Sequence, residues 1–355
     1  MTRRLLAIHD GIAWNAKWIA HCRAQGIPHR VVDCLRTDIM EQLRDCWGLM
    51  WLFHHMAPAH ILMARAVLNA ASAAGLRVFP DHQTCAHFDD KLAQKYVFDA
   101  LALPVPATWV FFDRQEAMDF VDSCALPVVG KLRRGAGSYN VRLLPTRRAA
   151  RAYVRRMFGR GYSPAPHVLA DARNKLQVAA THGWKGIGAR LRKAPRFFRI
   201  VTHARRFLAR EKGYVYLQEF LPGNDCDIRI SVVGDRAWGF RRIVRKRDFR
   251  ASGSGVIDYD PTKIPMQLVS QSFAAARALR MQSACFDWVR REDGAYRFVE
   301  VSMGFVDEAV YTCDGYWDRA RNWHKGHLSP AVAALEDLLA GRNAEAPNHA
   351  GPETT

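Results

Sequence analysis

QEFLPGNDCDIRISVVGDRAWGFRRIVRKRDFR, residues 218–250, combines a strand end, a polar loop and a hairpin signal. Apolar and polar residues alternate over 227–233 and 237–244, on either side of Gly234-Asp235, which predicts two antiparallel strands joined by a tight turn. A further strand, 214–220, enters the stretch and leads into a polar loop. We expect these strands to form one wall of a nucleotide site that continues into an anion-binding floor.

A second hairpin follows after a helix. Residues 285–291 and 296–301 alternate around Asp293-Gly294, and helical spacing covers 267–280 between the two hairpins. Adjacent strands would bring Asp287 and Glu300 close together on one face of a sheet. Two carboxylates at that separation suit Mg²⁺, which takes carboxylate and phosphate oxygens. Carboxylates of an edge strand that face solvent or an arginine are the alternative.

The first eighty residues alternate between short apolar strands and helical segments. Strand signals cover 5–8, 31–32, 48–53 and 76–79, and helical spacing covers 16–24, 39–44 and 59–74. Strands that alternate with helices predict a parallel α/β sheet.

A lysine and a glycine-rich loop stand between these two regions. Lys131 ends an extended segment, 127–131, that leads directly into RRGAGSYN. Small residues in that loop let backbone amides approach phosphate oxygens while the ammonium supplies charge, and those residues are Gly135, Gly137 and Ser138. The loop lacks the GxxxxGK[ST] pattern, so it is no Walker site. A surface turn is the alternative.

The end of the strand 214–220 could meet a nucleotide base. Strand-end backbone groups can pair with an adenine edge, and an acidic side chain in the following loop, here Asp225, can hold ribose hydroxyls. The strand end consists of Gln218, Glu219, Phe220 and Leu221. A polar hairpin turn is the alternative.

Two arginines differ from the many that we expect on the surface. Arg229 and Arg250 each lie in a strand context between apolar neighbours. Guanidinium groups on rigid elements make bidentate contacts to carboxylates or phosphates. The small residues 252–255 after Arg250 could close over such an anion.

The composition is that of an ordinary globular protein, with 49% hydrophobic and 24% charged residues. The longest uncharged apolar run, 46–53, is too short to cross a bilayer, and no signal-peptide core is present, so we expect a cytoplasmic protein. The eight cysteines form no CxxC pair, which favours reduced thiols over a zinc site.

The charge is strongly basic, with 52 Lys+Arg against 34 Asp+Glu and a formal net charge of +18. This excess favours an anionic partner. Much of it lies in a predicted basic helical insertion, about 147–210, which could contact a membrane surface peripherally or rest its apolar face on the domain. We expect no nucleic-acid partner, because no nucleic-acid-binding module accompanies the charge.

Taken in order, five segments resemble the ATP-grasp superfamily, most nearly its ribosomal-protein glutamate ligase and glutathione synthetase branch. They are DDKLAQKYVFDALALPVPATWV, VVGKLRRGAGSYNV, YLQEFLPGNDCDIRISVVGD, RKRDFRASGSG and FDWVRREDGAYRFVEVS, within about 80–305. Each segment is weak alone, and their order is specific. The resemblance implies an α/β (α+β) ATP-grasp fold with an N-terminal α/β domain (1–85) and a small lobe (86–212) that includes the insertion. A large lobe (213–341) and a disordered tail (342–355) follow.

The resemblance also implies roles for residues. Lys91 and Lys131 look like the two nucleotide-contacting lysines of the family, residues 135–138 like its mobile phosphate loop, and residues 218–221 like its adenine-binding strand end. These matches place the nucleotide between the two lobes.

The metal and acyl groups follow in the same way. Asp287 and Glu300 look like the magnesium ligands, and Arg229 and Arg250 resemble arginines near the phosphate and the acyl intermediate. Ser302 stands where the family usually has asparagine. A hydroxyl is a shorter and weaker oxygen ligand than an amide, which puts a second metal ion in question.

The activity that the resemblance implies is that of an ADP-forming carboxylate–amine ligase, working through an acylphosphate with ATP and one or two Mg²⁺ ions. We expect an anionic substrate such as a sugar acid or an acidic peptide. The HDG…WNAKW and FRASGSG segments resemble bacterial proteins of surface-polysaccharide assembly. A kinase that phosphorylates a hydroxyl, and a protein that only binds ATP or a polyanion, are the alternatives. The oligomeric state stays open.

Overall fold

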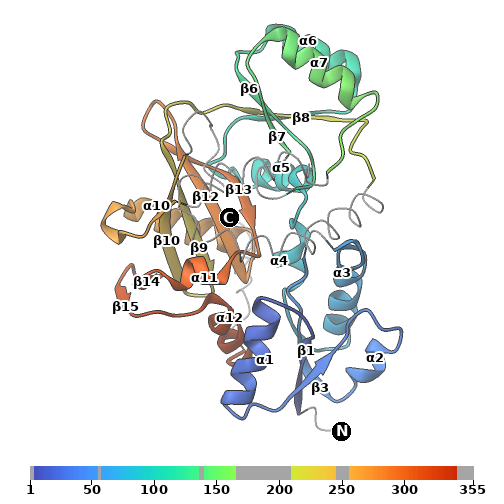
Figure 1. The fold of residues 1–355 in the computed structure, drawn as a ribbon, viewed down its shortest axis with the longest axis vertical. Coiled ribbons are helices and arrows are strands. Elements are labelled where there is room, and N and C mark those ends of the chain that lie inside the picture. Colours follow the sequence, from blue (N-terminus) through green and yellow to red (C-terminus); the bar gives the residue numbers. More distant parts are fainter. Residues whose placement is uncertain (1–3, 55–56, 136–139, 165–208, 245–255, 342–355) are drawn as a thin grey trace, which may run out of the picture.

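Three β-sheets follow one another along the chain in the computed structural model, which describes residues 4–54, 57–135, 140–164, 209–244 and 256–341. In Figure 1 the N-terminal sheet lies at the bottom, the small sheet at the top, and the large sheet on the left between them. The N-terminal sheet is parallel and the other two are mainly antiparallel. This mixed architecture confirms the predicted fold class.

The N-terminal sheet is parallel because a helix returns the chain after each of its first three strands. Its order is β2 (His29–Val32), β1 (Leu5–His9), β3 (Cys46–Met50) and β4 (Arg77–Phe79). The helices are α1 (Trp14–Ala24), α2 (Ile39–Gln42) and α3 (Pro58–Ala73). Both faces are covered, since Leu6 and Ile8 of β1 pack with Trp14 of α1 while Ala7 packs with Leu68 of α3.

The last helix, α12 (Pro330–Leu339), returns to this N-terminal sheet. The Trp18 Nε1–H donates to the Ala331 carbonyl oxygen at 2.7 Å, and Leu338 belongs to the same apolar core as Trp18. The two ends of the described chain therefore stabilise one another.

The small sheet has the order β5 (Thr108–Phe111), β8 (Val215–Glu219), β6 (Val128–Lys131) and β7 (Val141–Leu144). Helices α6 (Arg114–Ser123) and α7 (Arg147–Met157) supply Val121 and Val154 to its core. Strand β8 follows the predicted lobe boundary at 212/213, yet it pairs with β5 and β6 and not with the large sheet. Helices α4 (His82–Ala86) and α5 (Lys91–Ala100) connect the N-terminal and small sheets.

The large sheet contains both predicted hairpins. Its order is β13 (Tyr296–Ser302), β12 (Ser283–Arg290), β9 (Cys226–Val233), β10 (Arg236–Ile243), β14 (Gly315–Asp318) and β15 (Trp323–Lys325), and β11 (Ile257–Asp258) also pairs with β10. Helix α10 (Met266–Ala278) packs Phe273 against Ile230 on one face. The short elements η2 (Pro261–Lys263) and α11 (Asp307–Tyr311) lie in the connections.

Two predictions fall largely outside the described residues. The basic insertion is described at its start, where α7 buries Tyr153 and Val154 and exposes arginines, and residues 165–208 lie outside. The tail 342–355 also lies outside. Among the helices that the structure does describe, none combines the length and the apolar character needed to cross a membrane.

Candidate active site

Charged side chains gather on part of the large-sheet face opposite α10, next to the apolar Val233, Trp238 and Phe240. Along β9, Ile228 and Ile230 point into the apolar core, so Asp227 and Arg229 point to the other face by strand alternation. The register of β9 with β12 sets Asp287 directly opposite Arg229. The sheet thereby collects charged side chains on one surface.

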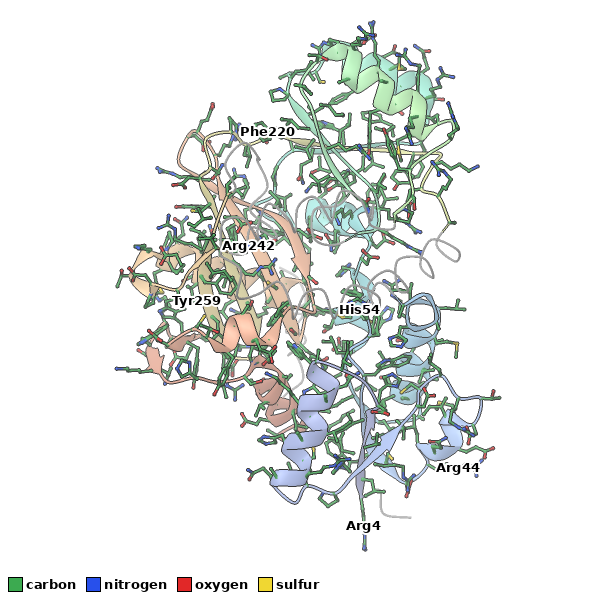
Figure 2. All side chains as sticks on the ribbon, in the orientation of Figure 1. Arg4, Arg44, His54, Phe220, Arg242 and Tyr259 are labelled. Carbon is green, nitrogen blue, oxygen red and sulfur yellow. The ribbon has the colours of Figure 1, made fainter. Side chains whose placement is uncertain are left out.

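These side chains form a connected ion network. Arg229 Nε and Nη2 donate to the two Asp287 carboxylate oxygens at 2.8 and 2.9 Å. Arg242 donates from Nε to Asp227 Oδ1 at 2.7 Å and from Nη2 to Asp287 Oδ2 at 2.7 Å. The sequence analysis missed Arg242, which Figure 2 marks among the strands of the large sheet. The signal was available, because the predicted hairpin register sets Arg242 opposite Asp227.

Burial and the neighbouring charges shift the pKa values of the two carboxyl groups in opposite directions. Burial would raise the pKa of Asp287, but the Arg229 and Arg242 guanidinium groups outweigh it and hold that pKa well below its ordinary value. Burial and the neighbouring Asp287 charge instead raise the pKa of Asp227. Asp287 is therefore the carboxylate that stays ionised most firmly.

Glu300 reaches the same place through an irregularity in the sheet. The pairing of β12 with β13 shifts between Phe286 and Trp288, so Val299 and Glu300 both fall opposite Asp287. Glu300 Oε1 accepts a hydrogen bond from Lys91 Nζ at 3.1 Å, and the Glu300 side chain is 34% exposed. Its carboxylate is therefore accessible.

Two buried lysines, one on α5 and one on β6, lie close to β13. Lys91 is the first residue of α5, and Lys131 is the last residue of β6, from which its Nζ donates to the Val299 carbonyl oxygen at 3.2 Å. Burial lowers the pKa of Lys131 to about 8, Glu300 opposes that change and Lys91 adds to it. The structure thus brings together both predicted lysines and Glu300.

The oxygen donors fit a magnesium ion. Asp287 Oδ1 accepts one hydrogen bond, from Arg229 Nε, and keeps a lone pair, and Glu300 is accessible. The Ser302 hydroxyl donates to the Gly304 carbonyl oxygen at 2.9 Å, so its own lone pairs stay available. No group of three or more His, Cys, Asp or Glu in the described part of the chain is arranged to hold a metal ion. The predicted ligands here are two carboxylates and one hydroxyl, on the paired strands β12 and β13.

The glycine-rich loop is described at its two ends. Gly135 has a φ of 122°, which glycine adopts readily, and a Cβ there would collide with the Asn140 amide. Two predicted loop residues, Gly137 and Ser138, lie outside the described residues, as does Arg250. Their roles stay predictions.

The predicted base-binding strand end is built as follows. The buried Gln218 donates from Nε2 to Thr108 Oγ1 at 3.1 Å, and the Glu219 N–H donates to the Ala107 carbonyl oxygen at 2.8 Å. Phe220 lies on the segment between β8 and β9 (Figure 2), Leu221 is buried, and the loop residue Asp225 is exposed. The Glu219 N–H is thus already used within the protein. The assignment of these five residues to base and ribose stays a prediction.

No family model and no curated protein matches the sequence. Solved structures do match. A RimK-domain ATP-grasp protein from Sphaerobacter thermophilus is 17% identical with a TM-score of 0.50, covering 84% of this chain and 90% of that one. The ATP-grasp ligase PsnB, complexed with minimal precursor, Mg and ADP, is 15% identical with a TM-score of 0.53, covering 96% and 98%.

D-alanine–D-alanine ligase from Bacillus anthracis, complexed with ATP, is 12% identical with a TM-score of 0.55 and covers 96% of this chain and 98% of that one. At such identities the likeness shows the fold, which extends over nearly the whole chain. The chain therefore has the ATP-grasp fold, as its five ordered segments predicted.

Proposed function

We propose that this protein is an ATP-dependent ligase that joins a carboxylate to an amine and releases ADP and phosphate. The observation that carries the proposal is the meeting of two buried lysines, Lys91 and Lys131, with the accessible carboxylate of Glu300. Such a site offers cations for phosphate oxygens and carboxylate oxygens for a metal. Neighbours in fold include ligases solved with Mg and ADP or with ATP.

The reaction has two steps. A substrate carboxylate oxygen attacks the γ-phosphorus of ATP, the bond to the bridging oxygen breaks, and ADP leaves. The amine then attacks the acyl carbon of the acylphosphate, inorganic phosphate leaves with the carboxylate oxygen, and the amine loses its proton. Phosphorylation is needed because oxide is a poor leaving group.

The positively charged side chains of the site would stabilise the transfer of the phosphoryl group in the first step. The ammonium groups of Lys91 and Lys131 would neutralise charge on the transferring phosphoryl group. Arg229 uses Nε and Nη2 on Asp287, which leaves its Nη1 for an anionic oxygen of the acyl group. We assign Arg250 to the same anion on the sequence alone.

Asp287, Glu300 and Ser302 would hold one or two magnesium ions. When bound, Mg²⁺ supplies positive charge that links phosphate oxygens to these side chains. Asp287 suits this role because its two guanidinium partners keep it ionised.

The substrate that we propose is anionic, a sugar acid or an acidic peptide. The support is the net charge of +18. A role in surface-polysaccharide assembly, on the cytoplasmic side where ATP is available, rests on the resemblance of the HDG…WNAKW and FRASGSG segments alone.

The test is incubation with ATP, Mg²⁺ and pooled sugar acids and acidic peptides, with hydroxylamine as a generic amine. A ligase forms hydroxamate together with ADP. A phosphorylated product without hydroxamate would indicate a kinase and not a ligase. Nucleotide binding without turnover would indicate a protein that only binds ATP.

The matched variants are Glu300→Gln and Glu292→Gln. Both remove one carboxylate from the same hairpin, but Glu292 is exposed beyond the end of β12. We expect Glu300→Gln to abolish Mg²⁺-dependent ADP formation and Glu292→Gln to retain it. Equal activities of the two variants would contradict the metal assignment.

A further inference from the structure

Residues at the start of α5 and just before it form hydrogen bonds with Gly135, which lies at the beginning of the glycine-rich loop. Asp89 Oδ1 accepts a hydrogen bond from the Gly135 N–H at 2.7 Å, and Lys91 Nζ donates to the Gly135 carbonyl oxygen at 3.0 Å. The Lys91 N–H also donates to the Arg133 carbonyl oxygen at 3.0 Å. Both polar backbone groups of Gly135 are therefore held by residues two positions apart.

Asp89 has no part in starting the helix that follows it. The neighbouring Asp90 is the N-cap of α5, where its Oδ1 accepts a hydrogen bond from the Ala93 N–H at 3.1 Å. Asp89 itself adopts a φ of 53°, in the left-handed region that side chains other than glycine rarely occupy. Such a conformation persists where the surrounding structure fixes it, and it clusters at functional sites.

Asn140, at the other end of the loop, is hydrogen-bonded to the peptide that joins Arg134 and Gly135. Asn140 Nδ2 donates to the Arg134 carbonyl oxygen at 2.9 Å and to the Pro164 carbonyl oxygen at 2.9 Å. Asn140 is buried, and the Gly135 Cα approaches it so closely that a Cβ would collide. The residues on both sides of the loop are thus anchored, and the Asp89 carboxylate accepts the hydrogen bond of the Gly135 N–H.

Lys91 connects this anchor to the proposed metal site. Its ammonium lies between the Gly135 carbonyl oxygen and Glu300 Oε1, at 3.0 and 3.1 Å. A phosphate group that binds the Lys91 ammonium would therefore lie beside Gly135 and Glu300 together. The ammonium has three N–H donors, so one remains for a phosphate oxygen, and the position of the Gly135 carbonyl oxygen helps to set where that donor points.

We propose that Asp89 is a positioning residue of the nucleotide site, which holds the Gly135 peptide against the Lys91 ammonium and so fixes where that ammonium meets a phosphate group. The inference rests on the proposed function, since it concerns the same nucleotide site. Asp89 acts through Gly135 and does not itself contact the nucleotide. Loss of its hydrogen bond therefore weakens ATP binding more than it slows the step that follows.

The experiment compares three changes at Asp89. Asp89→Ala removes the acceptor, Asp89→Asn keeps an acceptor oxygen without the charge, and Asp89→Gly removes the acceptor while suiting the positive φ. Asp113→Ala is the control, because Asp113 Oδ1 accepts a hydrogen bond from the Glu116 N–H at 2.8 Å at the start of α6, in the lobe that carries the loop. ATP affinity is measured by calorimetry, and KM and kcat by ADP release.

We expect Asp89→Ala and Asp89→Gly to raise Kd and KM for ATP about tenfold, the effect of one lost charge-assisted hydrogen bond, with a smaller change in kcat. Asp89→Asn keeps a neutral acceptor, so its Kd and KM should lie between those of Asp89→Ala and of the unmodified protein, and Asp113→Ala should bind ATP normally. If Asp89→Ala fails to fold, Asp89→Gly gives the answer.

Unchanged ATP affinity in Asp89→Gly would overturn the inference and leave the proposed function intact. Tighter ATP binding in both Asp89→Asn and Asp89→Gly would also overturn it, because the carboxylate would then compete with phosphate. If the unmodified protein binds no ATP, the proposed function and this inference both fail.

Discussion

Replacing Arg242 by methionine tests the ion network at the floor of the site. Arg242 and Asp227 are both 7% exposed and are joined by two hydrogen bonds, and Arg242 also contacts Asp287. Methionine fills similar space but leaves Asp227 as a buried carboxylate without that partner. Asp287 keeps the bidentate contact of Arg229.

The expected loss follows from the burial of the pair. Removing one partner of a buried ion pair costs about 3–5 kcal/mol, because the remaining charge is left desolvated. For units of 150–250 residues, about 1 kcal/mol corresponds to about 2–4 °C, so the melting temperature should fall by about 10 °C. Adding Asp227→Asn to Arg242→Met removes the stranded charge and should recover most of this loss.

Urea and thermal unfolding followed by tryptophan fluorescence measure the effect. The control is Arg241→Met on the same strand, since Arg241 is more exposed and meets Asp258 only at 3.6 Å. We expect that control to cost less than about 1 kcal/mol. The reasoning is refuted if Arg242→Met loses no more stability than Arg241→Met, or if the double variant is no more stable than Arg242→Met.

Two further predictions concern Lys131 and Ser302. Because burial lowers the pKa of Lys131 to about 8, between about pH 8 and about pH 10 the unfolded chain holds a proton that the folded protein has released. The free energy of unfolding should therefore rise with pH there, by at most about 1.4 kcal/mol per pH unit, and Lys131→Met should remove that part of the rise in urea titrations. Ser302→Asn supplies an amide oxygen that reaches further than the hydroxyl. The Mg²⁺ concentration at half-maximal ADP formation should therefore fall severalfold. An unchanged concentration would count against Ser302 as a metal ligand.

Local sequence signals were sufficient for the two hairpins of the large sheet, the helix between them and the N-terminal sheet. The turn residues Gly234-Asp235 and Asp293-Gly294 predicted the hairpins β9–β10 and β12–β13, and the structure confirms both. Helix α10 and the parallel N-terminal sheet are also confirmed. These features depend on strand alternation and on the torsion angles of neighbouring residues. Both follow from residue types that are close together in the sequence.

Features that depend on packing between distant segments were missed or misplaced. The apolar pattern of β8 fits a place in either antiparallel sheet, and only its pairing with β5 and β6 decides between them. The register of the predicted hairpin sets Arg242 opposite Asp227, but the contact of Arg242 with Asp287 depends on how β9 pairs with the distant strand β12.

By itself the sequence determined the order of the elements, the fold that their motifs imply, and the candidate residues Lys91, Lys131, Asp287 and Glu300. Only the tertiary structure decided how those residues meet, because Lys91 and Glu300 are 209 positions apart and their 3.1 Å contact depends on how α5 packs against β13. The ion pair of Asp287 with Arg229 and the hydrogen bond from the Gly135 N–H to Asp89 also depend on tertiary packing. Local periodicity fixes which face a side chain takes, whereas the partner on that face comes from another part of the chain.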